Sequence, residues 1–150
     1  MPYPRIHAFQ PNTFQHDLIV SGFTNKFTIA ETAVRTGKTG AVAAWHRWQA
    51  KANPGCVGLL GVQSFKWYRR AMHEVCKELF GHEAKFHGND FVWTFPRFSN
   101  AKIMVASAEN IDTIESVTAA WASIDEAQDI DFGVFEVLLA RISDKRAKFP

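Results

Sequence analysis

The stretch that decides the fold is Thr32-Ala-Val-Arg-Thr-Gly-Lys-Thr39, which lies between an apolar run over residues 27–30 and a small-residue run over residues 41–44. This order predicts a strand, a tight turn and the start of a helix. A phosphate-binding loop needs these elements in this order, because backbone N–H groups and a helix N-terminus then converge on one anionic group. The stretch therefore indicates a phosphate-binding loop.

The end of this stretch has the residue types that bind phosphate and metal. Gly37 lets the backbone approach the phosphates, Lys38 can reach the β and γ oxygens, and the Thr39 hydroxyl can ligate Mg²⁺. Thr36 completes the set expected to bind the nucleotide. Thr32 departs from the usual motif, which begins with glycine at that position. Taken alone, the stretch competes with a chance Thr-Gly-Lys-Thr turn.

Length and composition restrict the class of protein. The 150 residues suit one domain, and an apolar content of 47% is enough for a core. A net charge of +2 is too small to indicate nucleic-acid binding by itself. Cys56 and Cys76 are expected to be reduced core thiols, and the six histidines lack ligand spacing. The N-terminus has no signal pattern and no apolar run approaches ~20 residues, so we expect neither secretion nor membrane spanning.

Strands and helices are expected to alternate, which favours an α/β fold with a parallel sheet. Residues 57–62 are nearly all apolar, which predicts a strand buried on both faces. The other expected elements are a helix capped by Asn12 or Thr13, strands over 27–34, 91–95, 102–106 and 119–124, helices over 38–51, 64–80 and 132–142, and a weak helix or loop over 109–115.

A second motif follows the apolar strand over residues 119–124, where Asp125 and Glu126 stand side by side. Opposite a phosphate-binding loop, the first acid can hold Mg²⁺ directly or through water, and the second can orient and polarise the attacking water. This position is the carboxyl end of a strand, where open α/β sheets bind ligands. The alternative is an acidic helix start. The two motifs together favour nucleotide hydrolysis.

The loop TAVRTGKT, the acidic motif ASIDEAQD and the late segment LLARI resemble the ATPase half of a tailed-phage large terminase subunit, the motor that packages viral DNA. Lys38 and Asp125 are 125 − 38 = 87 positions apart, and the resemblance covers nearly the whole chain. It implies a P-loop NTPase fold of the additional-strand (ASCE) type, with a mostly parallel central sheet and flanking helices. It also implies ATP and Mg²⁺ as cofactors, Lys38 and Thr39 as phosphate and Mg²⁺ ligands, Asp125 as the metal-side acid and Glu126 as the catalytic acid.

The resemblance assigns further roles to three residues. Arg35 is expected to act in cis on the γ-phosphate, as an arginine finger does; the alternative is an ion pair with an acid such as Glu31 or Asp129. Gln15 is expected to read the adenine edge through its amide, against the alternative of an ordinary exposed amide. Arg141, near the end of the last helix, is expected to be a solvated helix arginine, with a contact to a neighbouring subunit or DNA as the alternative.

The resemblance has consequences for the length of the chain. The family continues past the position of Pro150 with a further core strand and a separate nuclease domain. We therefore expect residues 1–150 to form one partial P-loop ATPase domain, with residues 1–25 as an adenine-side segment, no nuclease domain and weak or no hydrolysis by the isolated chain.

The resemblance also implies partners and a location. The expected partners are double-stranded DNA, the portal protein and the small terminase subunit, with a homo-oligomeric ring in the full-length protein and no membrane. The expected location is the cytoplasm of the bacterial host. Two alternatives remain: a superfamily 1 helicase-like ATPase, which the Asp-Glu-Ala-Gln-Asp stretch over residues 125–129 also resembles, and a nucleotide-binding fragment without turnover.

Overall fold

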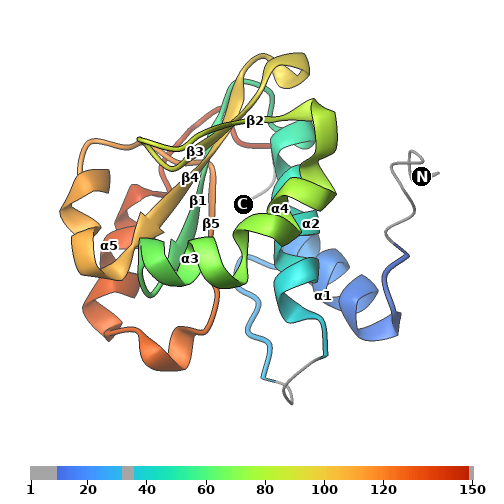
Figure 1. The fold of residues 1–150 in the computed structure, drawn as a ribbon, viewed down its shortest axis with the longest axis horizontal. Helices are drawn as coiled ribbons and strands as arrows, with labels where there is room; N and C mark the ends of the chain where they lie inside the picture. The colour runs from blue at the N-terminus through green and yellow to red at the C-terminus, as the bar shows by residue number, and fades with distance from the viewer. Residues whose placement is uncertain (1–9, 32–35, 149–150) are drawn as a thin grey trace.

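The computed structural model describes residues 10–31 and 36–148, which form one sheet with helices on both faces (Figure 1). The helices are α1 (Thr13–Thr24), α2 (Lys38–Ala52), α3 (Phe65–Ala71), α4 (His73–Phe80) and α5 (Phe132–Arg141). The strands are β1 (Val57–Val62), β2 (Lys85–His87), β3 (Val92–Phe95), β4 (Ala101–Ser107) and β5 (Trp121–Ile124). Short 3₁₀ turns are η1 (Gly81–Glu83), η2 (Pro96–Phe98), η3 (Ala108–Ile114) and η4 (Ala127–Asp129).

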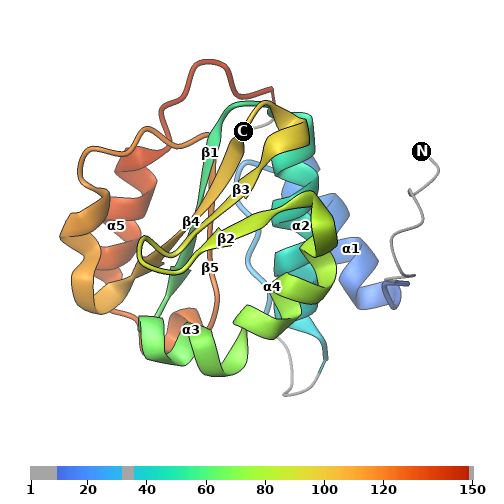
Figure 2. The same cartoon turned by 45° about the horizontal axis from the view of Figure 1, so that its top comes forward.

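The sheet has five strands in the order β2-β3-β4-β1-β5. The pairs β4–β1 and β1–β5 are parallel, whereas β2–β3 and β3–β4 are antiparallel. Helices α2 and α4 cover one face and α5 covers the other (Figure 2). The structure therefore confirms the predicted α/β class, a central sheet flanked by helices. No helix among the described residues is long and apolar enough to cross a lipid bilayer.

Strand β1 is the centre of the core, because its side chains are buried on both faces of the sheet. Leu60 and Val62 belong to the larger apolar cluster, which includes buried residues of α2, α3 and α4. Leu59 points to the other face and joins a smaller cluster with Leu138 of α5. This arrangement confirms the prediction of a doubly buried strand. Both cysteines, Cys56 and Cys76, are buried free thiols, as expected.

Helix α2 packs closely on its neighbours through small residues. Ala41 and Ala43 are completely buried, and Ala43 lies in the same cluster as Leu60 of β1. On the side of α1, Gly22 lies so close to Trp45 that a Cβ added there would be 2.6 Å from the indole nitrogen. The first residues of α2 are thus held in place from two sides.

The predicted strand over residues 27–34 is wrong in its described part. Residues 27–31 form no strand, and the side chains of Phe27 and Ile29 are 56% and 95% exposed. A strand exists only where its backbone groups pair with a neighbour, and within the described residues no such pairing joins 27–31 to the sheet. Residues 32–34 lie outside the described residues.

The predicted helix over residues 64–80 is broken into two at Met72. Its φ of −123° departs from helical geometry, and its side chain is fully buried. The break lets the two halves pack on different partners. Tyr68 of α3 accepts a 2.7 Å hydrogen bond from Nε1 of Trp93 in the sheet, while α4 packs against α2. A single straight helix would make either the contact with Trp93 or the contact with α2, but not both.

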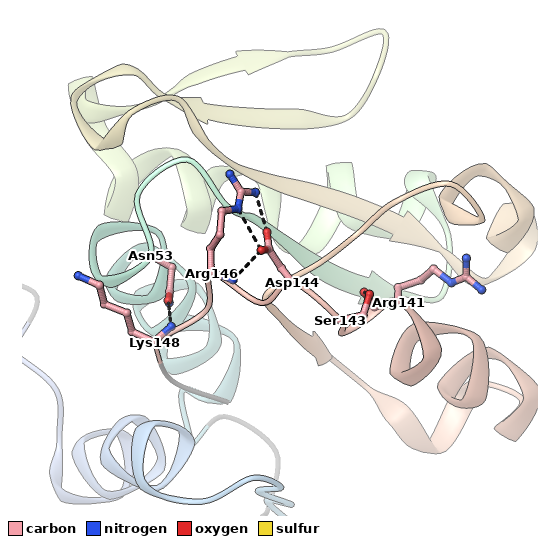
Figure 3. A network of polar contacts seen from close by, with 6 residues as sticks. All are labelled: Asn53, Arg141, Ser143, Asp144, Arg146 and Lys148. Carbon is pink, nitrogen blue, oxygen red and sulfur yellow. Dashed lines mark hydrogen bonds and ion pairs between the residues drawn. The ribbon is translucent and has the colours of Figure 1, made fainter.

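The segment over residues 142–148 connects the end of α5 to the end of α2 (Figure 3). Ile142 forms a parallel bridge with Ala119, just before β5. The Arg146 guanidinium donates two hydrogen bonds to Asp144, at 2.7 and 3.0 Å, which lower the pKa of that carboxyl to about 2. The N–H of Lys148 donates to Oδ1 of Asn53, the residue that ends α2, at 2.7 Å. Both helices next to β5 are therefore fixed at their C-terminal ends.

Replacing Gly58 with alanine tests how tightly β1 and β5 pack. Gly58 is paired with Trp121, and an added Cβ would lie 2.1 Å from the indole ring. We expect Gly58→Ala to lower the free energy of unfolding by about 1–3 kcal/mol through overpacking, measured by urea denaturation. Gly88→Ala is the control, because the nearest atom to an added Cβ there is 3.8 Å away, and its effect should stay within about 0.5 kcal/mol. Equal stabilities for the two variants would contradict the packing described for Trp121.

Candidate nucleotide-binding site

Helix α2 begins directly after Gly37, whose φ of 83° is in the left-handed region. Glycine adopts this conformation without strain, and the helix N-terminus that follows is the kind of position where backbone N–H groups bind anions in proteins. A Cβ at Gly37 would also lie 2.3 Å from Nε2 of Gln15. Gly37 therefore meets two requirements at once: the backbone conformation of the loop and the space for the amide of Gln15.

Strand β5 delivers Asp125 to the same place. The N–H of Asp125 still bonds to the carbonyl of Gly61 in β1, at 3.0 Å, so the sheet fixes its backbone. The Thr39 hydroxyl then donates to Oδ2 of Asp125 at 3.0 Å, although the two residues are 86 positions apart. The structure thus brings together the two residues predicted as metal ligands.

Asp125 is a buried carboxyl group whose oxygens accept hydrogen bonds from its neighbours. Its side chain lies in the interior, with only 3% of the residue exposed. Burial raises the pKa of Asp125, while the hydrogen bond from Thr39, the N–H of Glu126 and the charge of Lys38 act in the opposite direction. A cation bound at the carboxylate would offset the cost of burying its charge.

The donor set at Thr39 and Asp125 fits Mg²⁺. Both offer oxygen, and Mg²⁺ in nucleotide sites uses one or two protein oxygens together with waters and substrate phosphates. Within residues 10–31 and 36–148, no group of three or more His, Cys, Asp or Glu side chains is placed to hold a metal ion by protein ligands alone. A site that is completed by a phosphate ligand agrees with both observations.

Glu126 occupies the turn that follows β5. Its φ of 54° and ψ of 48° are left-handed, a conformation that costs a non-glycine residue about 1–2 kcal/mol. Its N–H donates to Oδ1 of Asp125 at 3.1 Å, and Nε2 of Gln128 donates to its Oε2. The backbone of Glu126 is therefore held against the Asp125 carboxylate, and one of its own carboxylate oxygens is bound by Gln128. The sequence analysis did not predict Gln128 as a site residue. The one feature of the sequence that could have indicated it is its position two residues after Glu126.

Gln15 contacts the loop directly. It lies in the first turn of α1, where it forms a capping box with Asn12. Its Oε1 accepts from the N–H of Asn12 at 3.0 Å, and its Nε2 donates to the carbonyl of Gly37 at 3.0 Å. Both ends of the amide are engaged within the chain, so recognition of adenine through this amide stays a prediction and requires at least one of these bonds to exchange.

The remaining predicted residues have different outcomes. Arg35 and Thr32 lie outside the described residues. The carbonyl of Thr36 accepts from Nδ2 of Asn12 at 3.5 Å. Arg141 ends α5 and donates from Nη1 to the carbonyl of Glu115. Arg141 therefore has a partner within its own chain, and its role toward a neighbouring subunit or DNA stays a prediction.

A buried polar relay beside the site was not predicted from the sequence. Nε1 of Trp121 donates to Nδ1 of His46 at 2.9 Å, and Nε2 of His46 lies 2.7 Å from the Ser123 hydroxyl. Since Nδ1 accepts a hydrogen bond, the proton of the neutral ring is on Nε2 and points to Ser123. His46 is fully buried, and burial lowers its pKa to about 3. The available signal was spacing: His46 stands seven residues after Thr39, two helical turns along the same face.

The fold is similar to that of phage large terminases and of a terminase ATPase domain. The large terminase of a thermophilic bacteriophage superimposes with a TM-score of 0.75 and 16% identity, over 93% of this chain and 38% of that one. The same protein in complex with ATP-γ-S gives a TM-score of 0.73, with 17% identity over 91% and 36%. The large terminase ATPase domain of Thermus phage P74-26 gives 0.67, with 17% identity over 89% and 61%.

These similarities establish the fold. The chain spans well under half the length of the first of these terminases and about three fifths of the length of the Thermus phage domain. A scan of the sequence against protein-family models finds no match, and a search of curated proteins finds no significant match.

The buried state of His46 predicts a pH effect on stability. In the folded chain its pKa is about 3, whereas the ordinary value is 6.5. The unfolded state therefore binds a proton below pH 6.5 that the folded state does not. We therefore expect the titration of His46 to leave the free energy of unfolding unchanged above pH 6.5. As the pH falls from 6.5 toward 3, it should lower the free energy of unfolding by up to about 1.4 kcal/mol per pH unit.

The measurement is urea denaturation of wild type and His46→Gln at pH values from about 7.5 to about 4, a range that spans most of the titration. Other titrating groups are common to both proteins and cancel in the difference. The wild type should lose more stability than the variant over this range. Parallel pH profiles would show that His46 is not held neutral.

Proposed function

We propose that the chain is the ATP-hydrolysing motor domain of a viral DNA-packaging terminase. The observation that carries this proposal is the hydrogen bond between Thr39 and Asp125. It lies at the carboxyl end of a parallel strand, in a fold shared with terminase ATPase domains. The large terminase of the thermophilic bacteriophage has been solved with ATP-γ-S and with ADP, which supports nucleotide binding by the same fold.

In this proposal, residues of α2 and β5 share the work of holding Mg-ATP. The N-terminus of α2 and the Lys38 ammonium bind the β- and γ-phosphates. The Thr39 hydroxyl and the Asp125 carboxylate hold Mg²⁺, which would neutralise charge that develops on the phosphate oxygens. The hydrogen bond between Thr39 and Asp125 supports this assignment, because it keeps the two side-chain oxygens close to each other.

Glu126 orients the attacking water and accepts its proton in this proposal. It lies in the turn that follows β5, and Gln128 donates a hydrogen bond to one of its carboxylate oxygens. Two adjacent acids can divide the tasks of metal ligand and general base. We assign Arg35 to the γ-phosphate as a charge-stabilising group in cis and Gln15 to the adenine edge.

The proposal extends to the whole motor. ATP hydrolysis would be coupled to translocation of double-stranded DNA into a procapsid, by a homo-oligomeric ring that works with the portal protein and the small terminase subunit in the cytoplasm of the bacterial host. The similarity in fold to large terminases supports this assignment. A packaging motor moves duplex DNA without unwinding it, so the absence of strand separation by the motor would exclude the helicase alternative.

Removing the Lys38 ammonium tests the assignment of the loop. We expect Lys38→Ala to weaken ATP binding about tenfold or more and to abolish turnover, because the β/γ oxygens lose the ammonium group that binds them in this proposal. Binding is measured by titration with a fluorescent ATP analogue. Lys51→Ala is the matched control, since Lys51 is exposed at the other end of the same helix. A Lys38→Ala variant with the affinity of wild type would refute the loop assignment.

Replacing Glu126 with glutamine separates binding from hydrolysis. We expect Glu126→Gln to bind ATP as wild type does and to hydrolyse it about 10²–10⁴-fold more slowly, because the amide cannot accept a proton. Phosphate release is measured under ATP saturation in the full-length protein, because residues 1–150 alone are expected to hydrolyse ATP weakly or not at all; Glu136→Gln on the exposed face of α5 is the control. A wild type that binds ATP but turns over no faster than the variant would establish the non-catalytic alternative.

A further inference from the structure

Side-chain hydrogen bonds join helix α2 to β5 and the residue after it at two points, and only one of these points belongs to the proposed metal site. The first is the bond from Thr39 to Asp125. The second is His46, which receives a hydrogen bond from Trp121 and donates one to Ser123. The second point lies deep in the core, because His46 is completely buried and Trp121 is 2% exposed.

The two points lie on matching faces of their elements. Thr39 and His46 are seven residues apart on α2, which places them on the same side of the helix about 10 Å apart along its axis. Trp121, Ser123 and Asp125 alternate along the extended chain and share one face of the sheet. Every second residue of this part of the chain therefore contacts α2.

The geometry of the relay is fixed on all sides. Trp121 is a donor only, so it forces His46 to accept at Nδ1 and to donate at Nε2. The indole lies directly against Gly58, in space that a Cβ at that position would fill. A rotation of the ring, a change of tautomer or a shift of α2 along β5 would each leave a buried polar atom unpaired.

From this geometry, and resting on the function proposed above, we propose that His46 and Ser123 are positioning residues for the metal site. They hold β5 at one register against α2, and so hold the Asp125 carboxylate within reach of Thr39. Neither residue touches the metal or the nucleotide. They act indirectly, by keeping the Thr39 and Asp125 oxygens in position to bind the metal. Removing such outer partners of metal ligands commonly lowers metal affinity about 10–100-fold.

The test measures how strongly Mg²⁺ and nucleotide assist each other's binding. The dissociation constant of ADP is determined by calorimetry with and without Mg²⁺, and the ratio of the two values is compared among variants. We expect Ser123→Ala to reduce this ratio about tenfold, with an unchanged constant in the absence of Mg²⁺, because the phosphate-binding residues are untouched. Ser123→Thr keeps the hydroxyl and should restore the ratio.

Ser107→Ala is the matched control. Ser107 is a fully buried serine at the end of the neighbouring strand β4. Its hydroxyl has no hydrogen-bond partner among the described residues, so the variant should leave the ratio as in wild type.

A second measurement needs neither metal nor nucleotide. In the ligand-free chain, ¹⁵N NMR should show the Nε2–H tautomer of His46 with slow exchange of its proton. Trp121→Phe removes the donor to Nδ1 and should abolish this preference, and it should lower the Mg²⁺ ratio in the same direction as Ser123→Ala. This variant also provides the test if Ser123→Ala does not fold.

The outcomes separate the two proposals. A wild type that binds no nucleotide overturns the proposed function and, with it, the positioning role. A wild type with Mg²⁺-dependent binding whose ratio is the same in Ser123→Ala and Trp121→Phe overturns the positioning role alone. An Nδ1–H tautomer in the wild-type spectrum also overturns it.

Discussion

The candidate site depends on the hydrogen bonds that hold α2 against one face of β5. Residues of α2 with little or no side chain, such as Ala43, allow the helix to lie close to the sheet. At that distance the short hydroxyl of Thr39 reaches Asp125, and the longer side chain of His46 reaches Ser123. A larger side chain in place of such an alanine would push α2 away from the sheet and separate Thr39 from the Asp125 carboxylate. The close packing of α2 on the sheet is therefore a condition for the contact between Thr39 and Asp125 in the candidate site.

Helix α2 achieves this position with several buried polar groups. His46, Arg47 and Gln49 are consecutive or nearly so, and all are buried. Arg47 binds Glu83 of η1 with hydrogen-bond and ion-pair distances of 2.7 and 2.6 Å, and Oε1 of Gln49 accepts from Asn53 at 2.8 Å. Apolar contacts tolerate sliding and rotation, whereas buried polar groups lose much of their free energy when they lose a partner. His46 and Arg47 have partners outside α2 and thus favour one orientation of the helix, whereas the bond between Gln49 and Asn53 stabilises the end of the helix itself.

Much of the fold and the centre of the site could be predicted from local patterns. Three local patterns combine residue type with position in the chain. They are the glycine-lysine-threonine turn at the start of α2, the nearly all-apolar run of β1 and the acidic pair after β5. The two expectations that failed both depended on partners far away in the chain. Residues 27–31 have the composition of a strand but no strand beside them in the described structure, and Met72 breaks a helix because its two halves pack on different elements.

The sequence by itself determined where the candidate phosphate-binding loop and the acidic strand end lie in the chain, because each of these motifs is set by neighbours within a few positions. Only the tertiary structure decided how those groups face one another. The left-handed turn at Glu126, the engagement of Gln15 with Gly37, and the relay from Trp121 through His46 all join separate elements. Their geometry follows from the height of α2 on the sheet and the register of β5 against β1, and packing over the whole core sets both quantities.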